Sequence, residues 1–179
     1  RATAVLFDSK GWNVALSFVG NQESADETCA LCERAGVTGN AFARKCDVCD
    51  ENSVVDFFST VRGRFGAING VVNNAGIVAP QSTLADMDIG RMKDVFDTNI
   101  LGAYLVAREA ARTLHSGTAI VNVSSMAAKL GSPGEYVDYA GSKGAMDTLT
   151  IGLAKELGPL GIRVNAVRPG IIDTDIHAS

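Results

Sequence analysis

Two residues, Tyr139 and Lys143, have the types and the spacing that proton exchange with a carbonyl or alcohol oxygen requires. A separation of four residues at the start of a predicted helix places the phenol and the ammonium side by side on one face. The ammonium would stabilise the phenolate, so the tyrosine could act as an acid or a base toward a substrate oxygen. Taken alone, the two residues also fit a solvated helix face, and their significance depends on the rest of the chain.

Polar or small residues follow three of the predicted strands, at positions that support this chemistry. They are residues 73–76, Ser124 with Ser125, and residues 168–174. The carboxyl ends of parallel strands border a ligand crevice, so these residues would gather at one edge of a sheet. Asn99 lies inside a predicted helix, where asparagine is unfavourable unless its amide finds partners. Each segment could be an ordinary turn or a satisfied core amide, but their joint occurrence favours a site.

Short β-rich runs alternate with helical patterns along the chain. The predicted strands cover 14–19, 41–46, 68–73, 119–123 and 162–167. The predicted helices cover 22–35, 51–64, 88–114 and 139–157. This alternation predicts an α/β fold, a doubly wound parallel sheet with helices on both faces in three layers, forming a single domain over residues 1–179. Residues 1–10 begin as a helix that Gly11 ends, and Asn69-Gly70 lies within a buried-strand pattern, so it is not a hairpin turn.

The composition is that of a soluble globular protein. The chain has 179 residues, 46% of them hydrophobic, and a net charge of −4. An acidic balance argues against nucleic acid or an anionic membrane as a partner. No run approaches the roughly 18 apolar residues that a membrane span needs. No secretory leader is recognisable, so we expect a cytoplasmic protein.

Four cysteines form two C-x-x-C motifs, Cys29 with Cys32 and Cys46 with Cys49. On spacing alone they resemble a four-thiolate zinc site. The first two, however, fall inside a helical run without the tight turn that brings paired thiolates onto one ion. We therefore expect buried or incidental thiols and no metal, with zinc as the alternative.

The sequence resembles the short-chain dehydrogenase/reductase family from its first residue to its last. The motifs that carry the resemblance are NNAG ending at Gly76, TNILGAY around Asn99, VNVSS ending at Ser125, YAGSK from Tyr139 to Lys143, and RPGIIDT ending at Thr174. Residues 130–150 especially resemble the bacterial glucose-1-dehydrogenase-like branch. The resemblance implies a Rossmann-type fold and hydride transfer between a nicotinamide cofactor and a small-molecule carbonyl or alcohol substrate.

The family resemblance favours a sugar or small polyol as the substrate, with a 3-oxoacyl thioester as the alternative. A non-catalytic dinucleotide-binding regulator on the same fold is a more distant alternative, and it should lack one of the residues Ser125, Tyr139 and Lys143. The resemblance also suggests a homotetramer built through helices 88–114 and 139–157, which carry small and apolar residues on more than one face.

The resemblance implies catalytic roles for four residues. Tyr139 would be the acid and base, and Lys143 would support it while holding the nicotinamide ribose hydroxyls. Ser125, with Ser124 as the alternative, would hydrogen-bond the substrate oxygen. Asn99 would anchor a water molecule linked to Lys143.

Cofactor contacts are implied for two further groups of residues. Those toward the adenosine would be Asp47, Val48, Asn74, Ala75 and Gly76. Those toward the nicotinamide carboxamide would be Pro169, Gly170, Ile172 and Thr174. The family's glycine-rich phosphate loop and first strand would precede Arg1, and its last strand and substrate-covering helices would follow Ser179.

The end of the predicted strand over 14–19, which corresponds to the second strand of the family's fold, predicts which nicotinamide cofactor is used. An acidic residue there would bind the ribose 2′-hydroxyl and repel a 2′-phosphate. That position is Phe18, which does neither, and Asn21 and Ser24 beyond it could bond a phosphate. We therefore expect NADP(H) to be favoured, with NAD(H) possible.

Overall fold

A computed structural model describes residues 1–35 and 40–172. The chain forms two compact units, Arg1–Ala67 and Ile68–Ser179, and each is described by itself. The expectation of a single domain stays a prediction. Of the residues expected to bind the cofactor, Thr174 lies outside the described residues.

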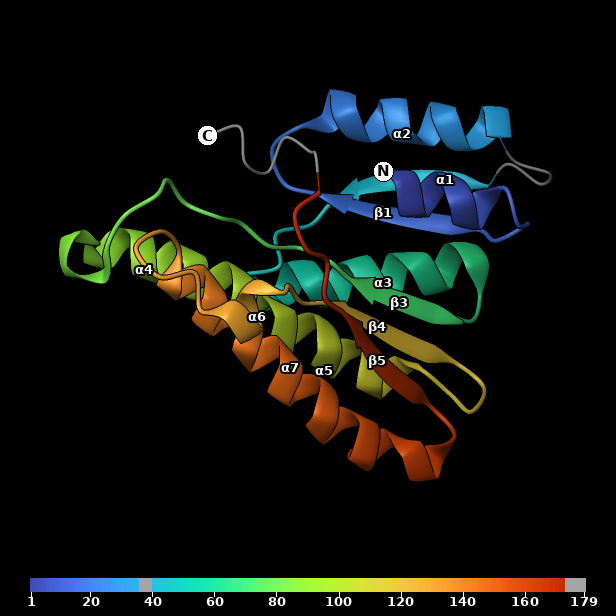
Figure 1. Cartoon of the computed structure of the whole chain (residues 1–179). Coiled ribbons are helices and arrows are strands. Elements are labelled where there is room, and N and C mark those ends of the chain that lie inside the picture. The colour runs from blue at the N-terminus through green and yellow to red at the C-terminus, as the bar shows by residue number, and fades with distance from the viewer. Residues whose placement is uncertain (36–39, 173–179) are drawn as a thin grey trace. The chain divides into compact units, whose positions relative to one another are not determined.

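The first unit is a two-stranded parallel sheet with helices. Its elements are α1 (Ala2–Asp8), β1 (Val14–Phe18), α2 (Gln22–Ala35), β2 (Ala41–Lys45) and α3 (Glu51–Phe65) (Figure 1). The two strands pair in parallel, with Val14 opposite Ala41. Helix α2 packs against both strands, and α1 packs against α2 and β1. The Asp50 carboxylate begins α3 by accepting a hydrogen bond from the Asn52 amide at 3.0 Å, which satisfies one of the free amides of its first turn.

The second unit is a three-stranded parallel sheet in the order β3-β4-β5. Its strands are β3 (Gly70–Asn73), β4 (Ala119–Val123) and β5 (Arg163–Val167). Its helical segments are η1 (Leu84–Asp86), α4 (Ile89–Phe96), η2 (Asp97–Gly102), α5 (Ala103–Thr113), α6 (Ala127–Leu130), α7 (Val137–Leu157) and η3 (Gly158–Leu160).

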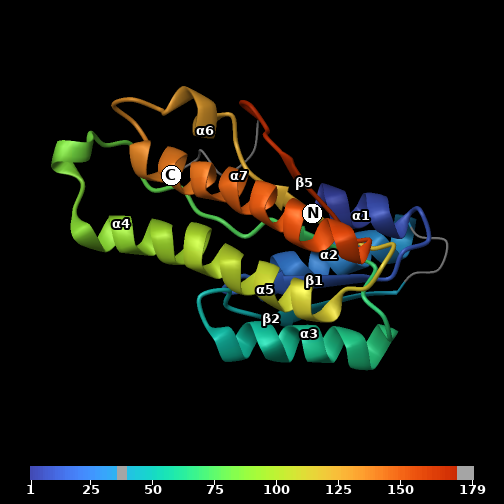
Figure 2. The ribbon, with the colours of Figure 1, turned by 90° about the horizontal axis from the view of Figure 1, so that it is seen from below.

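Helices α5 and α7 cover the second unit's sheet and run side by side (Figure 2). Helix α5 contacts β3, while α7 contacts β4 and β5. Small residues on α5 allow this approach: Ala103 and Ala107 form a buried cluster with Met146 and Leu149 of α7. Burial of these side chains holds α7 against α5.

The predicted alternation of strands and helices is confirmed, with most boundaries within two residues of the observed ones. Gly11 follows α1 with φ +83°, as expected for a helix terminator. Gly70 begins β3, which pairs in parallel with β4, so Asn69-Gly70 is not a hairpin turn. The predicted helix over 88–114 is helical from Ile89 to Thr113, but it is not α-helical throughout. Residues Asp97–Gly102 form a π-helical turn between α4 and α5, a wider turn that frequently marks functional sites.

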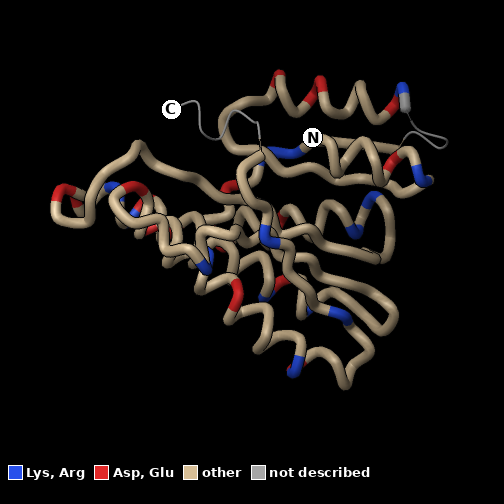
Figure 3. The backbone as a smooth tube through the Cα atoms, viewed as in Figure 1, with Lys and Arg blue, Asp and Glu red and all other residues tan. Residues whose placement is uncertain are grey.

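Charged residues are interspersed in sign along both units (Figure 3). The sequence has 20 acidic and 16 basic residues. In the part of the chain that the structure describes, no helix combines the length and the apolar character needed to cross a membrane.

Beneath the ends of the strands in the second unit lies a buried chain of polar side chains. The Asn73 amide donates to the Ala103 carbonyl at 2.9 Å and to the Asn122 amide oxygen at 3.2 Å. Asn122 in turn donates to the Thr150 hydroxyl at 2.9 Å, and that hydroxyl donates to the Met146 carbonyl at 2.8 Å. Because every member has a partner, this chain joins β3, β4, α5 and α7 without leaving a buried polar group unpaired.

Replacing Thr150 by valine should lower the free energy of unfolding by about 1–3 kcal/mol, because the buried Asn122 amide loses its acceptor. The control is Thr148→Val on the same helix, whose hydroxyl is exposed and bonds only the Gly144 carbonyl. Urea unfolding of the two variants measures both effects. Equal losses in both would contradict the role given to the buried chain.

Candidate active site

Helix α7 is fastened to the carboxyl end of β4 by Lys143. Its ammonium donates a hydrogen bond to the Val123 carbonyl at 2.8 Å, and the residue is only 4% exposed. Burial lowers the pKa of Lys143, because a charged amine loses hydration there. The Ser124 hydroxyl donates to the Lys143 carbonyl at 3.1 Å. The end of β4 and the second turn of α7 are therefore joined by two hydrogen bonds.

Tyr139 stands in the first turn of α7, one turn before Lys143. The Lys143 nitrogen lies 5.6 Å from the centre of the Tyr139 ring. The tyrosine is half-buried while the lysine is buried. The helix thus presents a partly accessible phenol beside a buried amine, the arrangement that the spacing of the two residues predicts.

The buried Asn99 in the π turn holds the segment that follows β3. Its amide oxygen accepts a hydrogen bond from the Ile77 amide at 2.7 Å, and its amide nitrogen donates to the Ile77 carbonyl at 2.8 Å. The same nitrogen donates to the Ser142 hydroxyl at 3.1 Å, and Ser142 donates to the Tyr139 carbonyl at 2.7 Å. Asn99 therefore links the segment after β3 to the helix that carries Tyr139.

Gly76 lies where the side chains of Asn99 and Lys143 come close to the backbone. A Cβ atom at this position would lie 3.2 Å from the Asn99 Oδ1 atom and 3.3 Å from the Lys143 Nζ atom. Both neighbours are held by hydrogen bonds. A Cβ atom at this position would therefore press on both side chains, and glycine lets the backbone pass close to Lys143 without displacing either of them.

The two serines after β4 have different environments. Ser124 is 2% exposed, and its hydroxyl is committed to the Lys143 carbonyl. Ser125 is half-buried, and its oxygen accepts a hydrogen bond from the Ala127 amide at 3.1 Å. Because this bond uses the oxygen as an acceptor, the Ser125 hydroxyl proton can be donated to another group. The geometry favours Ser125 over Ser124 as the reactive hydroxyl.

The segment after β5 is attached to the same edge. The Ser124 amide donates to the Val167 carbonyl and the Met126 amide to the Pro169 carbonyl, both at 2.9 Å. Arg168 donates through Nε to both carboxylate oxygens of Asp147 on α7, at 3.0 and 2.9 Å. Burial raises the pKa of Asp147, but the hydrogen bonds from Arg168 outweigh it and hold this pKa below the ordinary value.

The second unit therefore brings together most of the residues that the sequence predicts for the site. Nine of these residues are connected by hydrogen bonds, close contacts or adjacent positions on one sheet edge: Asn74, Ala75, Gly76, Asn99, Ser125, Tyr139, Lys143, Pro169 and Gly170. Ile172 follows on the same segment and is 54% exposed.

Three predicted cofactor residues belong to the first unit. Asn21 is exposed, and its side-chain oxygen accepts a hydrogen bond from the Ser24 amide at 2.8 Å. Asp47 follows β2 and accepts a hydrogen bond from the Cys49 amide at 2.9 Å, while Val48 is buried. These contacts shape the turns that end β1 and β2, and they are described within the first unit alone.

Several residues that organise the site were not singled out in the sequence. Asn122 and Thr150 belong to the buried chain of polar side chains, and Ser142 links Asn99 to α7. Asp147 and Arg168 connect the segment after β5 to α7. Their hydrogen bonds join elements far apart in the chain. An asparagine in the middle of an apolar strand, as at Asn122, is the one local signal that could have indicated them.

The cysteines do not converge on an ion in the described residues. No group of three or more His, Cys, Asp or Glu side chains there could hold a metal ion. Cys32 and Cys46 are buried, and burial raises the pKa of both thiols. Cys29 and Cys32 lie within α2, as expected.

The family model described as enoyl-(acyl carrier protein) reductase matches residues 1–179. An uncharacterised oxidoreductase of Escherichia coli K12, YgfF, is 47% identical over 184 residues, covering 100% of this chain and 74% of that protein. The 3-oxoacyl-[acyl-carrier-protein] reductase FabG of Staphylococcus aureus is 34% identical over 179 residues, covering 98% of this chain and 71% of that protein.

Solved structures show the same fold. A short-chain dehydrogenase of Burkholderia cenocepacia J2315, in complex with NADP, matches with a TM-score of 0.92 at 32% identity, covering 98% of this chain and 70% of that one. A dehydrogenase/reductase of Sinorhizobium meliloti 1021 matches with the same TM-score and identity, covering 98% and 68%. These similarities confirm the Rossmann-type α/β fold.

The Asp147 carboxylate should stabilise the fold in a way that depends on pH. Its lowered folded-state pKa means that its contribution is complete above the ordinary value of 3.8 and is lost as the pH falls through the lowered value. Asp147→Asn should therefore lower the free energy of unfolding by about 1–3 kcal/mol at pH 7. The difference from the unmodified protein should shrink under acid conditions.

Urea unfolding at pH 7, 5, 4 and 3 measures this difference. Asp94→Asn, at an exposed position of α4, is the control and should change little at any pH. A loss at Asp147→Asn that stays constant down to pH 3 would show that the charge is not its source.

Proposed function

The chain belongs to the short-chain dehydrogenase/reductase family and is an oxidoreductase that works with NAD(P); from this premise we propose that Tyr139 moves the proton as a hydride passes reversibly between nicotinamide and a carbonyl or alcohol carbon. The observation that carries the proposal is the half-buried Tyr139 phenol beside the buried Lys143 amine, at the sheet edge where Ser125 also stands.

The residues at this edge fit a nicotinamide cofactor. Lys143 uses one donor on the Val123 carbonyl, and an ammonium has three, so it has donors left for ribose hydroxyls. At Gly76 the backbone passes close to Asn99 and Lys143, where a Cβ atom would crowd both side chains, and small residues in this segment suit a close approach of a ligand to the backbone. Pro169, Gly170, Ile172 and Thr174 would hold the nicotinamide carboxamide. When bound, the nicotinamide would give or take the hydride.

In the direction of carbonyl reduction, this chain's residues would bind, polarise and protonate the substrate oxygen. Ser125 would donate a hydrogen bond to the carbonyl oxygen, which favours the negative charge that develops there. Tyr139 would give its phenolic proton to that oxygen, and Lys143 would stabilise the negative charge left on the tyrosine. In the direction of alcohol oxidation, the proton would return to Tyr139.

Asn99 would complete the path that returns a proton to Tyr139. Both N–H donors of its side chain are used by Ile77 and Ser142, and its side-chain oxygen already accepts from the Ile77 amide. We therefore propose that its contribution to a water linked to Lys143 comes from its backbone. A π turn supports this assignment, because its widened spacing leaves a carbonyl without the ordinary i→i−4 donor.

In the first unit, we propose that Asp47 and Val48 contact the adenine and that Asn21 lies near the ribose 2′ position. Asn74, Ala75 and Gly76 would line the adenosine ribose. The complex of the Burkholderia relative with NADP supports an NADP(H) enzyme, and NAD(H) is possible.

For the substrate, we propose a sugar or a small polyol, on the resemblance of residues 130–150 to the glucose-1-dehydrogenase-like branch. A 3-oxoacyl thioester is the second candidate, since FabG of Staphylococcus aureus is 34% identical. Turnover of sugars, ketones and 3-oxoacyl thioesters with both nicotinamide cofactors separates the two. A dinucleotide-binding regulator without activity is a weaker candidate, because Ser125, Tyr139 and Lys143 are all present.

We also propose a cytoplasmic homotetramer. Large apolar side chains stand exposed on the helices expected to form its interfaces: Leu101 at 51%, Tyr104 at 43% and Ile151 at 56%. Exposed apolar side chains that form a contiguous patch are typical of association surfaces.

Tyr139→Phe removes the proton donor and keeps the ring, so it should lower kcat by at least about 10²-fold. Cofactor binding should change little. The matched control is Tyr136→Phe, three residues earlier, where the residue four positions on is Ala140 and not a lysine. Steady-state kinetics and cofactor titration of the two variants test the proposal. A Tyr139→Phe enzyme that keeps more than about a tenth of its turnover would show that the proton comes from elsewhere.

Cofactor preference should follow from the absence of an acidic residue at Phe18. The value of kcat/KM should be higher with NADPH than with NADH on one substrate, because nothing at this position repels a 2′-phosphate. Phe18→Asp should reverse the order by introducing that repulsion, whereas Ser17→Asp, one position earlier, should not. An unmodified enzyme about tenfold better with NADH would overturn the expectation.

A further inference from the structure

A buried ion pair connects the helix that carries Tyr139 to the segment after β3. Arg91 of α4 donates to Asp138 of α7 through Nε at 2.9 Å and through Nη2 at 3.2 Å. Their side chains are 10% and 1% exposed. Asp138 directly precedes Tyr139, and its carboxylate also accepts a hydrogen bond from the Tyr139 amide at 2.9 Å.

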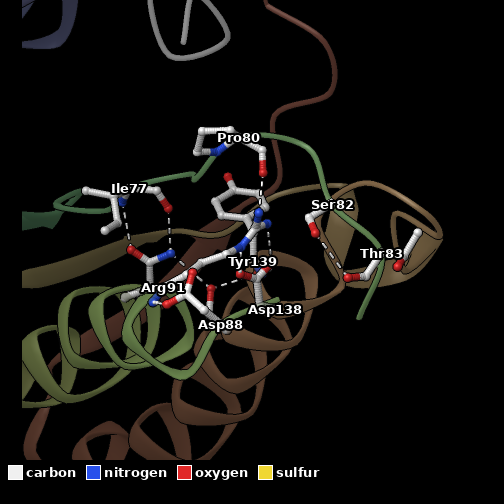
Figure 4. A network of polar contacts seen from close by, with 10 residues as sticks. Ile77, Pro80, Ser82, Thr83, Asp88, Arg91, Asp138 and Tyr139 are labelled. Carbon is white, nitrogen blue, oxygen red and sulfur yellow. Dashed lines mark hydrogen bonds and ion pairs between the residues drawn. The ribbon is translucent and has the colours of Figure 1, made fainter. Parts of the chain in front are cut away.

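Arg91 has a third partner, the carbonyl of Pro80, to which Nη1 donates a hydrogen bond. Pro80 lies in the segment that leaves β3 past Gly76 and Ile77 (Figure 4). The backbone of Arg91 is fixed as well, because its amide donates to the Asp88 carboxylate that begins α4, at 2.9 Å. One guanidinium therefore holds three parts of the chain: α4, the first turn of α7 and the segment around Pro80.

The strength of this connection follows from its geometry. Arg91 binds the carboxylate with two parallel donors, an arrangement that fixes direction as well as distance. Burial raises the pKa of Asp138, but the hydrogen bonds from Arg91 and the Tyr139 amide outweigh it and keep this pKa below the ordinary value. A second link reinforces the first, since the Ser82 amide donates to the Glu135 carbonyl just before α7 at 3.0 Å.

We propose that Arg91 and Asp138 are positioning residues that hold the segment 77–82 against the first turn of α7 and so set the space in which a carbonyl substrate meets Tyr139. This inference rests on the proposed function for the role of Tyr139. Both residues are committed to protein partners, because each guanidinium nitrogen and both carboxylate oxygens take part in the contacts above. They act through Pro80, Ser82 and Tyr139.

The decisive variant is Arg91→Met with Asp138→Leu, made in the whole protein. Replacing both members of a buried ion pair by apolar residues of similar volume often keeps stability, whereas removing one member leaves a buried charge unpaired. The double variant should therefore unfold thermally near the unmodified protein but leave the Pro80 carbonyl without its donor. Hydrogen exchange at the Ser82 amide should rise at least about tenfold, while exchange within β4 stays unchanged.

In the same variant, kcat/KM for the carbonyl substrate should fall by about tenfold to 100-fold, because a substrate that is held loosely beside Tyr139 reacts slowly. The dissociation constant for NADPH should change less than about threefold. Arg112→Met is the control: its pair with Glu109 is exposed and local to α5, so exchange and kcat/KM should both stay as they were.

Unchanged protection of Ser82, or full kcat/KM in the stable double variant, would overturn the proposal and leave the ion pair a stabilising contact only. If the double variant does not fold, Arg91→Lys decides in the same way, because one ammonium cannot reproduce the two-donor grip on Asp138 together with the bond to Pro80. Failure of the proposed function is a separate result. It would show as no turnover by the unmodified enzyme, and exchange at Ser82 would still test the positioning role.

Discussion

The hydrogen bond from the Lys143 amine to the Val123 carbonyl is the contact on which the site depends. Desolvating an amine is costly, and the carbonyl at the end of β4 compensates for part of that cost. The bond also sets how far α7 can slide along the sheet. Since Tyr139 is one turn away on the same helix, the position of the phenol relative to Ser125 follows from it. The Ser124 hydroxyl, bonded to the backbone of Lys143, opposes rotation about this single contact.

Around this contact, each loop at the sheet edge is tied to α7 by a different side chain. Asn99 ties the segment after β3 through Ser142, Ser124 ties the segment after β4, and Asp147 ties the segment after β5 through Arg168. Loops that carry functional groups are usually more mobile than the elements they join. Here one long helix provides a common reference for three of them, so the groups keep their spacing when any one loop moves.

Most of the fold and the centre of the site were predictable from sequence because their signals are local. Apolar strands alternating with helices predict the parallel pairing, and a spacing of four residues predicts the Tyr139–Lys143 arrangement. The remaining features depend on contacts between distant positions. Arg91 and Asp138 are 47 residues apart, and Asn122 and Thr150 are 28 apart. Apart from the asparagine in the apolar strand at Asn122, no local pattern distinguishes these side chains from solvated ones, and the π turn leaves no mark in the composition of residues 97–102.

The π turn has a consequence for the helices on either side of it. The buried positions Val95, Asn99, Ala103 and Ala107 recur every four residues. In an unbroken α-helix each such step turns about 40° beyond a full revolution. The two steps from Val95 to Ala103 would carry the buried stripe about 80° around the helix and toward solvent. The turn at Asp97–Gly102 has more residues per turn, so each residue rotates less about the helix axis. This compensates for part of the rotation and keeps the buried positions on one side of the helix. The amide of Asn99 and the small side chains of Ala103 and Ala107 can therefore lie on the same face of this helical stretch. The amide contacts the segment after β3, and the alanines lie in the buried interior.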